Sequence, residues 1–186
     1  GPLKTFEFAG GNQEQTSQGS LLYLPDFKLY QQTVLGNTFD LTCYSSTGMP
    51  SYFALFCRFN DSERASQYNL RQPIIETLNI ECETTKRQSD VVSGNLGKHQ
   101  LFHLTQRNVH PASNYNSVAY NRRQVVLLSA EDVGLMALRQ SDYQSLRRVR
   151  FSFKGTLNMP GKFQVVFVYN NRGLEVDGAN IRIVRL

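Results

Sequence analysis

Residues 148–155 of the chain read Arg-Val-Arg-Phe-Ser-Phe-Lys-Gly, an unbroken alternation of polar and apolar side chains. In an extended strand, Val149, Phe151 and Phe153 would all point to one face, because successive side chains alternate between the two faces. An amphipathic helix would instead need apolar residues three or four positions apart. The stretch therefore predicts a half-buried β-strand whose arginines and lysine face water.

The same period of two recurs on both sides of this strand, in short runs separated by Gly, Pro, Asn and Ser. Further strands are predicted at residues 27–30, 38–42, 51–59, 73–82, 162–169, 174–176 and 181–186. Residues 51–59 are apolar on both faces, which is typical of a strand at the centre of a sheet. Residues 170–173 and 177–178 read as hairpin turns, so the chain is expected to end as a β-meander. Short apolar runs at 124–128 and 133–138 lie on either side of Ser129-Ala130-Glu131-Asp132, where a turn and a helix start are equally plausible, so this stretch is left open.

About eight antiparallel strands predict an all-β fold, a jelly-roll β-sandwich with a long loop and short helix insertion. The insertion is expected between residues 83 and 123, and residues 97–104 within it are predicted to form one or two helical turns. Gly1-Pro2-Leu3 resembles the scar of a removed tag. We therefore divide the chain into an N-terminal scar and extended arm, residues 1–24, and a single jelly-roll domain, residues 25–186.

Composition places the chain among globular proteins, with 40% hydrophobic and 19% charged residues in 186. Neither a membrane-spanning run nor a signal segment is predicted. The net charge of +5 is uneven, because residues 122–186 hold 11 Lys or Arg against 5 Asp or Glu. This bias favours either weak nucleic-acid contact through the C-terminal third or, more commonly, a solvated strand face.

Cys43, Cys57 and Cys82 lie in or beside apolar strand-like runs and form no CxxC pair. Buried free thiols with a structural role are the expected outcome, which favours a reducing compartment. The setting of these cysteines lacks the exposed, basic surroundings of a nucleophile.

The motifs tested for chemistry do not assemble into a catalytic site. His99 and His103 are spaced to share one helical face, but no HExxH pattern is present and a third ligand would have to be His110 or a distant carboxylate. The metal pattern of cupin enzymes is also missing, and residues 94–98 lack phosphate-loop spacing. We therefore assign no catalytic, cofactor-binding or metal residue, expect no cofactor, and predict that the chain is not an enzyme.

Two segments of the chain resemble a known family. Residues 49–61, Met-Pro-Ser-Tyr-Phe-Ala-Leu-Phe-Cys-Arg-Phe-Asn-Asp, followed by residues 67–75, are similar to the second, C-terminal jelly roll of double-jelly-roll viral major capsid proteins. Polinton or Maverick elements, adintoviruses and adenovirus-like lineages carry such proteins. The tail, residues 163–169 and then 173–177, resembles the family's closing hairpin. Residues 69–73 depart from the family's Asn-Pro-Phe-like segment, and the chain has room for one roll only.

The resemblance implies a capsid protein, or one jelly-roll domain of one, that acts by self-assembly and resides in the virion. Assembly would take place in the host cytoplasm or nucleus. Its partners would be other capsid subunits, in a homo-oligomer such as a trimer. The arginines at 122, 123, 147, 148 and 150 would then face nucleic acid or a neighbour's acidic loop. The alternative is a non-catalytic jelly-roll module that recognises a carbohydrate or a protein, with Tyr115 and Tyr120 contributing to an aromatic pocket. A metal-dependent cupin-like enzyme is a third alternative.

Overall fold

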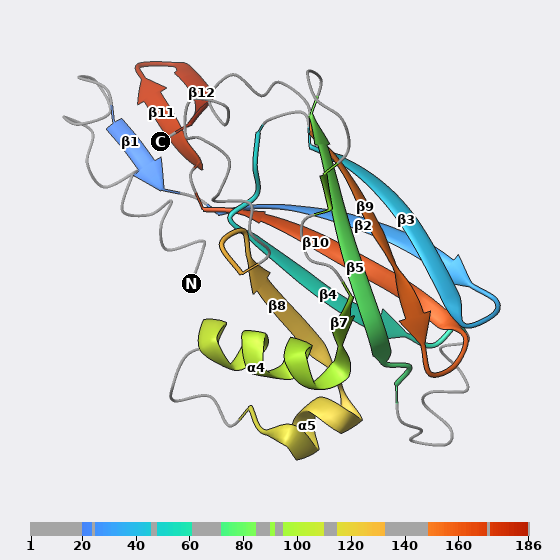
Figure 1. The fold of residues 1–186 in the computed structure, drawn as a ribbon. Helices are drawn as coiled ribbons and strands as arrows, with labels where there is room; N and C mark the ends of the chain where they lie inside the picture. Colours follow the sequence, from blue (N-terminus) through green and yellow to red (C-terminus); the bar gives the residue numbers. More distant parts are fainter. Residues whose placement is uncertain are drawn as a thin grey trace. The chain divides into compact units, whose positions relative to one another are not determined.

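The computed structural model describes residues 20–23, 25–45, 48–60, 72–84, 90–91, 95–109, 115–132, 149–170 and 172–185. These residues form twelve β-strands and two α-helices (Figure 1). The chain divides into two compact units, residues 28–167 and residues 1–27 with 168–186, which we describe separately. The run predicted at 133–138 lies outside the described residues.

Two sheets make up the larger unit. The first has the strand order β2 (Asp26–Val34), β10 (Gly161–Tyr169), β4 (Tyr52–Arg58) and β8 (Val125–Ser129). The second has the order β3 (Thr38–Ser45), β9 (Val149–Leu157), β5 (Ile75–Thr84) and β6 (Asp90–Val91), with β7 (Leu96–Gly97) also paired to β5. We call them the β2 sheet and the β3 sheet.

Strand pairing is nested along the sequence. β2 neighbours β10, β3 neighbours β9, β4 neighbours β8, and β5 neighbours β6 and β7. Early strands thus pair with late ones, and consecutive strands from β2 to β5 alternate between the two sheets. This is the topology of a long hairpin rolled into a sandwich. The predicted all-β jelly roll is therefore confirmed, and β4 occupies the interior sheet position expected for residues 51–59.

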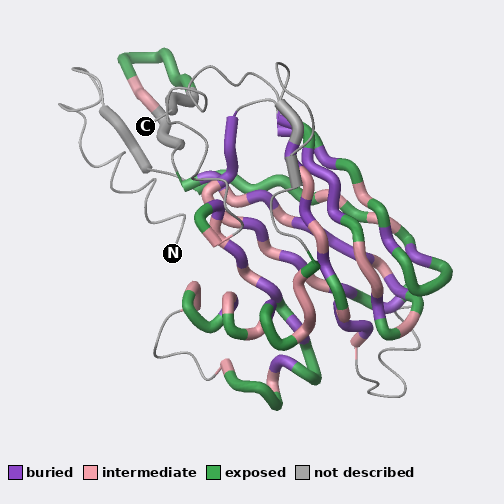
Figure 2. Tube along the Cα trace, viewed as in Figure 1, coloured by how far each residue is buried: buried purple, intermediate pink, exposed green. Residues whose placement is uncertain are grey.

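Aromatic rings from both sheets fill the space between them. Phe53 of β4 and Phe167 of β10 meet Phe151 and Phe153 of β9 at ring centroid distances of 5.2 to 6.1 Å. All four side chains are fully buried. Figure 2 shows the resulting alternation of buried and exposed positions along the strands. Such edge-to-face contacts add to the stabilisation that burial alone supplies.

The strand predicted at residues 148–155 behaves largely as expected from Val149 onward, and Arg148 lies outside the described residues. Val149, Phe151 and Phe153 are buried, and Arg150 and Lys154 are exposed. Ser152 is also buried, because β9 lies between β3 and β5 and neighbouring strands cover its outer side. Gly155 ends the stretch where a Cβ would stand 2.0 Å from the Thr77 carbonyl oxygen, so only glycine allows this close approach.

The helical insertion is longer than predicted. α4 runs from Lys98 to Asn108 and α5 from Ser117 to Arg122, whereas the sequence indicated only one or two turns at 97–104. The Gln100 side chain accepts a hydrogen bond from the Gly97 N–H at the start of α4. None of the described helices has the length and apolarity needed to cross a bilayer.

The smaller unit contains a separate antiparallel sheet with the order β1 (Ser20–Tyr23), β11 (Arg172–Asp177) and β12 (Asn180–Arg185). The predicted turn at 177–178 is confirmed, since Asp177 pairs with Asn180 and Gly178 adopts a φ of 57°. The predicted hairpin at 170–173 is wrong, because β10 and β11 belong to different sheets. Turn residues indicate that the chain changes direction, but they do not determine which strand the next strand pairs with. The division into an arm and a domain at residue 25 stays a prediction.

Candidate assembly surfaces

One edge of the β2 sheet is closed by side chains from the helical insertion. Strand β8 pairs with β4 on one side, and α4 packs on β8. The Leu127 N–H donates to Thr105 Oγ1 at 3.0 Å, and Asn108 Nδ2 donates to the Leu127 carbonyl at 2.8 Å. The Tyr115 hydroxyl donates to the Val125 carbonyl. The strand's outward backbone groups are thus paired as a further strand would pair them, which removes a template for edge pairing.

The far end of the same edge is closed by Asp132. Its Oδ2 accepts from the Ser129 N–H and from Asn108 Nδ2, and its Oδ1 accepts from Arg107. Burial by itself raises the pKa of the Asp132 carboxyl, but the hydrogen bonds from Asn108, Ser129 and Arg107 outweigh it, and the pKa lies below its ordinary value. The carboxylate is therefore held ionised while buried.

The edge of the β3 sheet at β3 is capped in a similar way by β2. The Asp40 N–H donates to Gln32 Oε1 at 3.0 Å, and the Tyr30 hydroxyl donates to the Tyr44 carbonyl. Side chains of β2 that face the sandwich interior thus reach across to backbone groups of β3.

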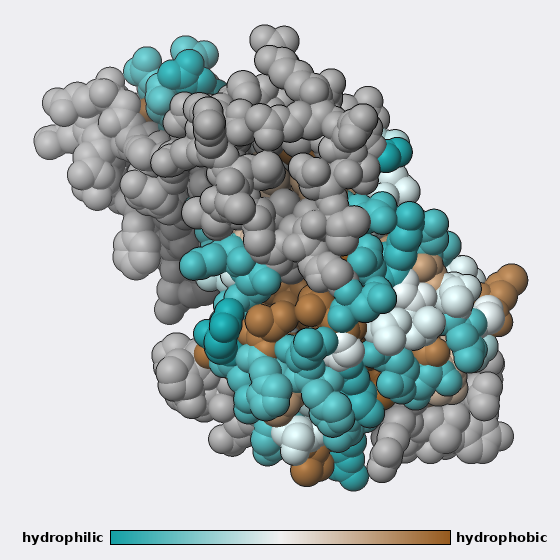
Figure 3. Space-filling model, in the orientation of Figure 1, coloured by the Kyte–Doolittle hydropathy of each residue, from teal (hydrophilic) through white to brown (hydrophobic). Residues whose placement is uncertain are grey.

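Strand β2 itself forms the opposite edge of its sheet and presents apolar side chains to solvent. Leu29 is 53% exposed, Phe27 in the same strand is 62% exposed, and Leu35 in the turn that follows is 84% exposed. Figure 3 shows a hydrophobic tip where Figure 1 places the β2–β3 turn. We call β2 with this turn the β2 edge. A nine-residue edge strand with an exposed leucine, followed by a second exposed leucine in the turn, is the kind of edge that soluble monomers avoid.

The outer faces of the two sheets also differ in chemistry. The β3 sheet carries hydrogen-bonding and charged groups outward, including a Lys154–Glu81 ion pair at 3.3 Å and a hydrogen bond between the hydroxyls of Thr77 and Thr156. The β2 sheet turns mostly apolar side chains outward, beside the hydrogen-bonded pair Gln31 and Gln164, at positions that alternate with its core residues: Leu29, Tyr52, Ala54, Phe56, Val125, Leu127 and Val166. Residues 51–59 are apolar on both faces because one face of β4 lies in the core and the other contributes to this outer surface.

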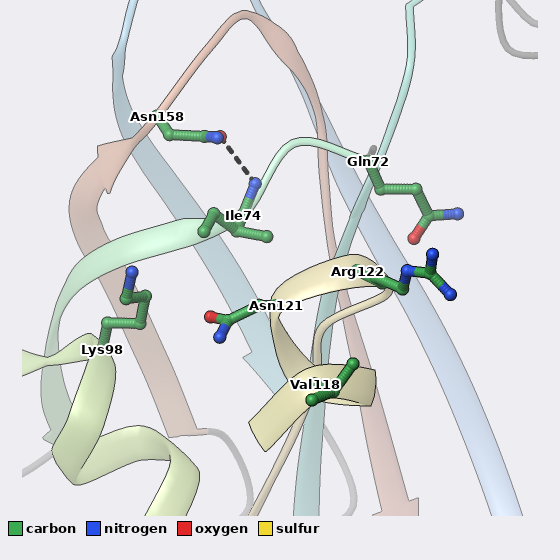
Figure 4. Close-up of a pocket in the computed structure, with 7 residues that line it drawn as sticks. All are labelled: Gln72, Ile74, Lys98, Val118, Asn121, Arg122 and Asn158. Atoms are coloured by element: carbon green, nitrogen blue, oxygen red, sulfur yellow. Dashed lines mark hydrogen bonds between the residues drawn. The ribbon is translucent and has the colours of Figure 1, made fainter. Parts of the chain in front are cut away.

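A pocket of about 460 Å³ opens where four chain segments meet at one end of the sandwich. Figure 4 shows side chains from the segment before β5, the start of α4, the end of α5 and the turn after β9. The lining residues are Gln72, Ile74, Lys98, Val118, Asn121, Arg122 and Asn158. Asn158 Oδ1 accepts from the Ile74 N–H at 2.7 Å, which ties two walls together.

The histidines considered as metal ligands lie on the solvent side of α4. His99 and His103 are both exposed, and His110 lies outside the described residues. Among the described residues, no group of three or more His, Cys, Asp or Glu side chains is placed to hold a metal ion. That the chain has no catalytic, cofactor-binding or metal-binding residue stays a prediction.

Cys43, Cys57 and Cys82 are buried and are not joined in a disulfide, as predicted. Burial raises the pKa of Cys43 and of Cys57 to about 12, so both thiols stay protonated and unreactive at neutral pH.

Tyr115 and Tyr120 do not line the pocket. They pack with Phe102 at centroid distances of 5.0 to 6.1 Å, and their hydroxyls form hydrogen bonds with Val125, Lys98 and Gln124.

Of the five arginines singled out in the sequence, Arg122 lines the pocket, Arg123 and Arg150 are exposed elsewhere, and residues 147 and 148 lie outside the described residues.

Comparison with known proteins supports the fold through structure alone. No protein-family model matches the chain, and no curated protein matches it in sequence. A chain in the 3.5 Å cryo-EM structure of the Sputnik virophage superposes with a TM-score of 0.52 and 16% identity, over 89% of this chain and 39% of that one. A DUF4785 family protein from Legionella pneumophila covers 87% and 39% at 13% identity, but its TM-score of 0.28 is too low to support any argument. The chain thus shares the jelly-roll fold of part of the virophage chain and spans less than half of it.

No sequence pattern pointed to the residues that close the β8 edge. Thr105 and Asn108 are ordinary polar residues in a helix, and their importance depends on the strand edge that the helix meets. The three-residue spacing of the two side chains, on one face of a helix, is the one signal that a search for capping contacts could use.

Proposed function

We propose that this chain is a structural protein of a viral capsid, or one jelly-roll domain of such a protein, and that it acts by self-assembly in the virion. The observation that carries the proposal is the superposition of 89% of the chain on a virophage chain with a TM-score of 0.52. The alignment reaches 39% of that chain, which leaves room in it for a second domain of similar size. The resemblance to the second roll of double-jelly-roll capsid proteins points to the same role.

The surfaces of the sandwich support an assembly role. A shell subunit needs a stiff body whose edges are closed except where neighbours bind. In this chain the β8 edge is closed by four side chains, while the β2 edge exposes Leu29 and Leu35. We propose that the β2 edge, together with the apolar outer face of its sheet, contacts a second jelly roll of the same kind.

Several finer points belong to the same proposal. The lineage is that of Polinton, adintovirus or adenovirus-like capsids, the oligomer is a trimer, and the subunit does no catalysis. Assembly takes place in the host cytoplasm or nucleus, and the basic residues of the C-terminal third contribute weak nucleic-acid contacts.

The test is the solution mass of the chain across protein concentration and salt, by light scattering after size exclusion, with negative-stain microscopy of the largest species. We expect trimers or closed particles of uniform size, and we expect their share of the total protein to increase with protein concentration. A chain that stays monomeric at every concentration contradicts self-assembly.

A further inference from the structure

The pocket at the end of the sandwich is lined by two cationic side chains without a described counter-ion, which lie on opposite sides of the opening in Figure 4. Lys98 is half-buried and Arg122 is exposed, and both line the pocket. In the described part of the chain, ion pairs form at Arg107, Lys154 and Arg182 but at neither of these two cations. Glu76 does not line the pocket. The lining therefore carries positive charge and no carboxylate.

The pocket is held in shape by buried hydrogen bonds beneath it. Gln124 exchanges two hydrogen bonds with the Ile75 backbone, at 2.7 and 3.0 Å, and donates to the Tyr120 hydroxyl. That hydroxyl donates in turn to the Lys98 carbonyl at 3.0 Å. The network joins the start of α4, the end of α5 and the start of β5. Binding to a preformed site costs less ordering entropy than binding to a mobile one.

The polar groups that remain for a ligand are mainly donors. Asn158 Oδ1 is used by the Ile74 N–H, so its Nδ2 is the group left to donate. Together with the Lys98 ammonium and the Arg122 guanidinium, it favours an anionic, acceptor-rich ligand. Ile74 and the 64% exposed Val118 add apolar surface beside the cations. Figure 4 shows the arrangement of these side chains around the opening.

From this chemistry we propose that the pocket binds an acidic protein segment, a carboxylate side chain flanked by an aliphatic one. The planar guanidinium matches a carboxylate in bidentate geometry, and the apolar wall accommodates the flanking residue. Single-stranded nucleic acid fits less well, because its binding uses aromatic side chains for base stacking and a track of cations for the backbone. The pocket lining has two cations and no aromatic residue. The inference is separate from contact through the β2 edge.

The test measures binding of the full chain to a fluorescein-labelled hexapeptide, Gly-Leu-Asp-Val-Glu-Gly, by fluorescence anisotropy. Saturable binding is expected, and Arg122→Glu and Lys98→Glu should each weaken it at least tenfold. Arg123→Glu is the matched control, because Arg123 adjoins Arg122 and is exposed but does not line the pocket. It should change the affinity less than twofold. A peptide with Asn and Gln in place of its acids should bind at least tenfold more weakly.

Two outcomes would overturn the proposal. Equal losses in Arg122→Glu and Arg123→Glu would mean that general charge rather than the pocket attracts the peptide. Tighter binding of a 12-nucleotide single-stranded DNA, lost in Arg122→Glu and kept in Arg123→Glu, would assign the pocket to phosphate instead. Circular dichroism melting curves of the variants establish that they are folded, since all three side chains lie at the surface.

Discussion

The two edge strands of the β2 sheet, β8 and β2, differ in how their outward sides are covered. At β8, side chains of Thr105, Asn108, Tyr115 and Asp132 satisfy the outward backbone groups. At β2, a nine-residue strand forms the edge, and the side chain of Leu29 within it is 53% exposed. One edge is thus closed within the subunit, and the other edge is left apolar. Stability of the subunit and its association with neighbours therefore depend on different edges. The β8 edge is expected to govern folding, and the β2 edge is expected to govern contact with neighbours.

The largest effect is expected from Asn108→Leu. Asn108 donates to the carbonyls of Leu104 and Leu127 and to Asp132, so the change removes the side-chain donor of the part-buried Leu127 carbonyl and one of the donors to Asp132. A loss of about 2–3 kcal/mol in the free energy of unfolding follows. Urea denaturation measures it. Gln106→Leu, at an exposed position of the same helix, is the control and should stay within about 0.5 kcal/mol.

A somewhat smaller loss is expected from Thr105→Val. The substitution keeps the shape of the buried side chain but removes the hydroxyl that accepts from the Leu127 N–H. We expect a loss of about 1–2 kcal/mol, measured by the same denaturation, because a buried donor is left unpaired. Thr105→Ser keeps the hydroxyl and should retain the Leu127 bond. If the valine and serine variants were equally stable, the hydrogen bond would not close the edge.

Acid should weaken the β8 edge before it affects the β2 edge. The folded-state pKa of Asp132 lies below its ordinary value, so its contribution to stability is complete above the unfolded-state pKa of about 4. That contribution is lost as the pH falls through the folded-state pKa. Melting temperatures measured between pH 6 and pH 2 should therefore fall less steeply in Asp132→Asn than in the wild type. Parallel profiles would contradict the assignment.

The smallest effect on stability is expected at the β2 edge. Leu29→Lys places a charge at an exposed edge position, as natural edge strands often do, and should change the free energy of unfolding by less than about 0.5 kcal/mol. Its effect on association should be large by comparison. A destabilised Leu29→Lys variant would show that Leu29 packs within the subunit.

The strands of this fold follow from local pattern, and the closing of its edges does not. Alternation placed Val149, Phe151 and Phe153 in the core, because burial of one face depends on residues adjacent in sequence. The turn at 170–173 was assigned to a hairpin, although β11 pairs in a different sheet, because pairing depends on distant strands.

The candidate surfaces were predictable only in part. Arg122 was singled out by charge, but its companion Lys98 is 24 residues earlier in the chain and joins it through the buried contacts of Tyr120 and Gln124. The length of α4 was underestimated because part of its support comes from β8, which its sequence does not reveal. Tertiary contacts of this kind override local propensity.

The most direct test of assembly through the β2 edge is sedimentation velocity of the wild type, Leu29→Lys and Gln106→Lys across a hundredfold range of concentration. Gln106→Lys adds the same charge on the exposed side of α4. The account predicts that the wild type and Gln106→Lys associate as concentration rises, and that Leu29→Lys stays monomeric. Association of Leu29→Lys equal to that of the wild type, or a wild type that never associates, would contradict it.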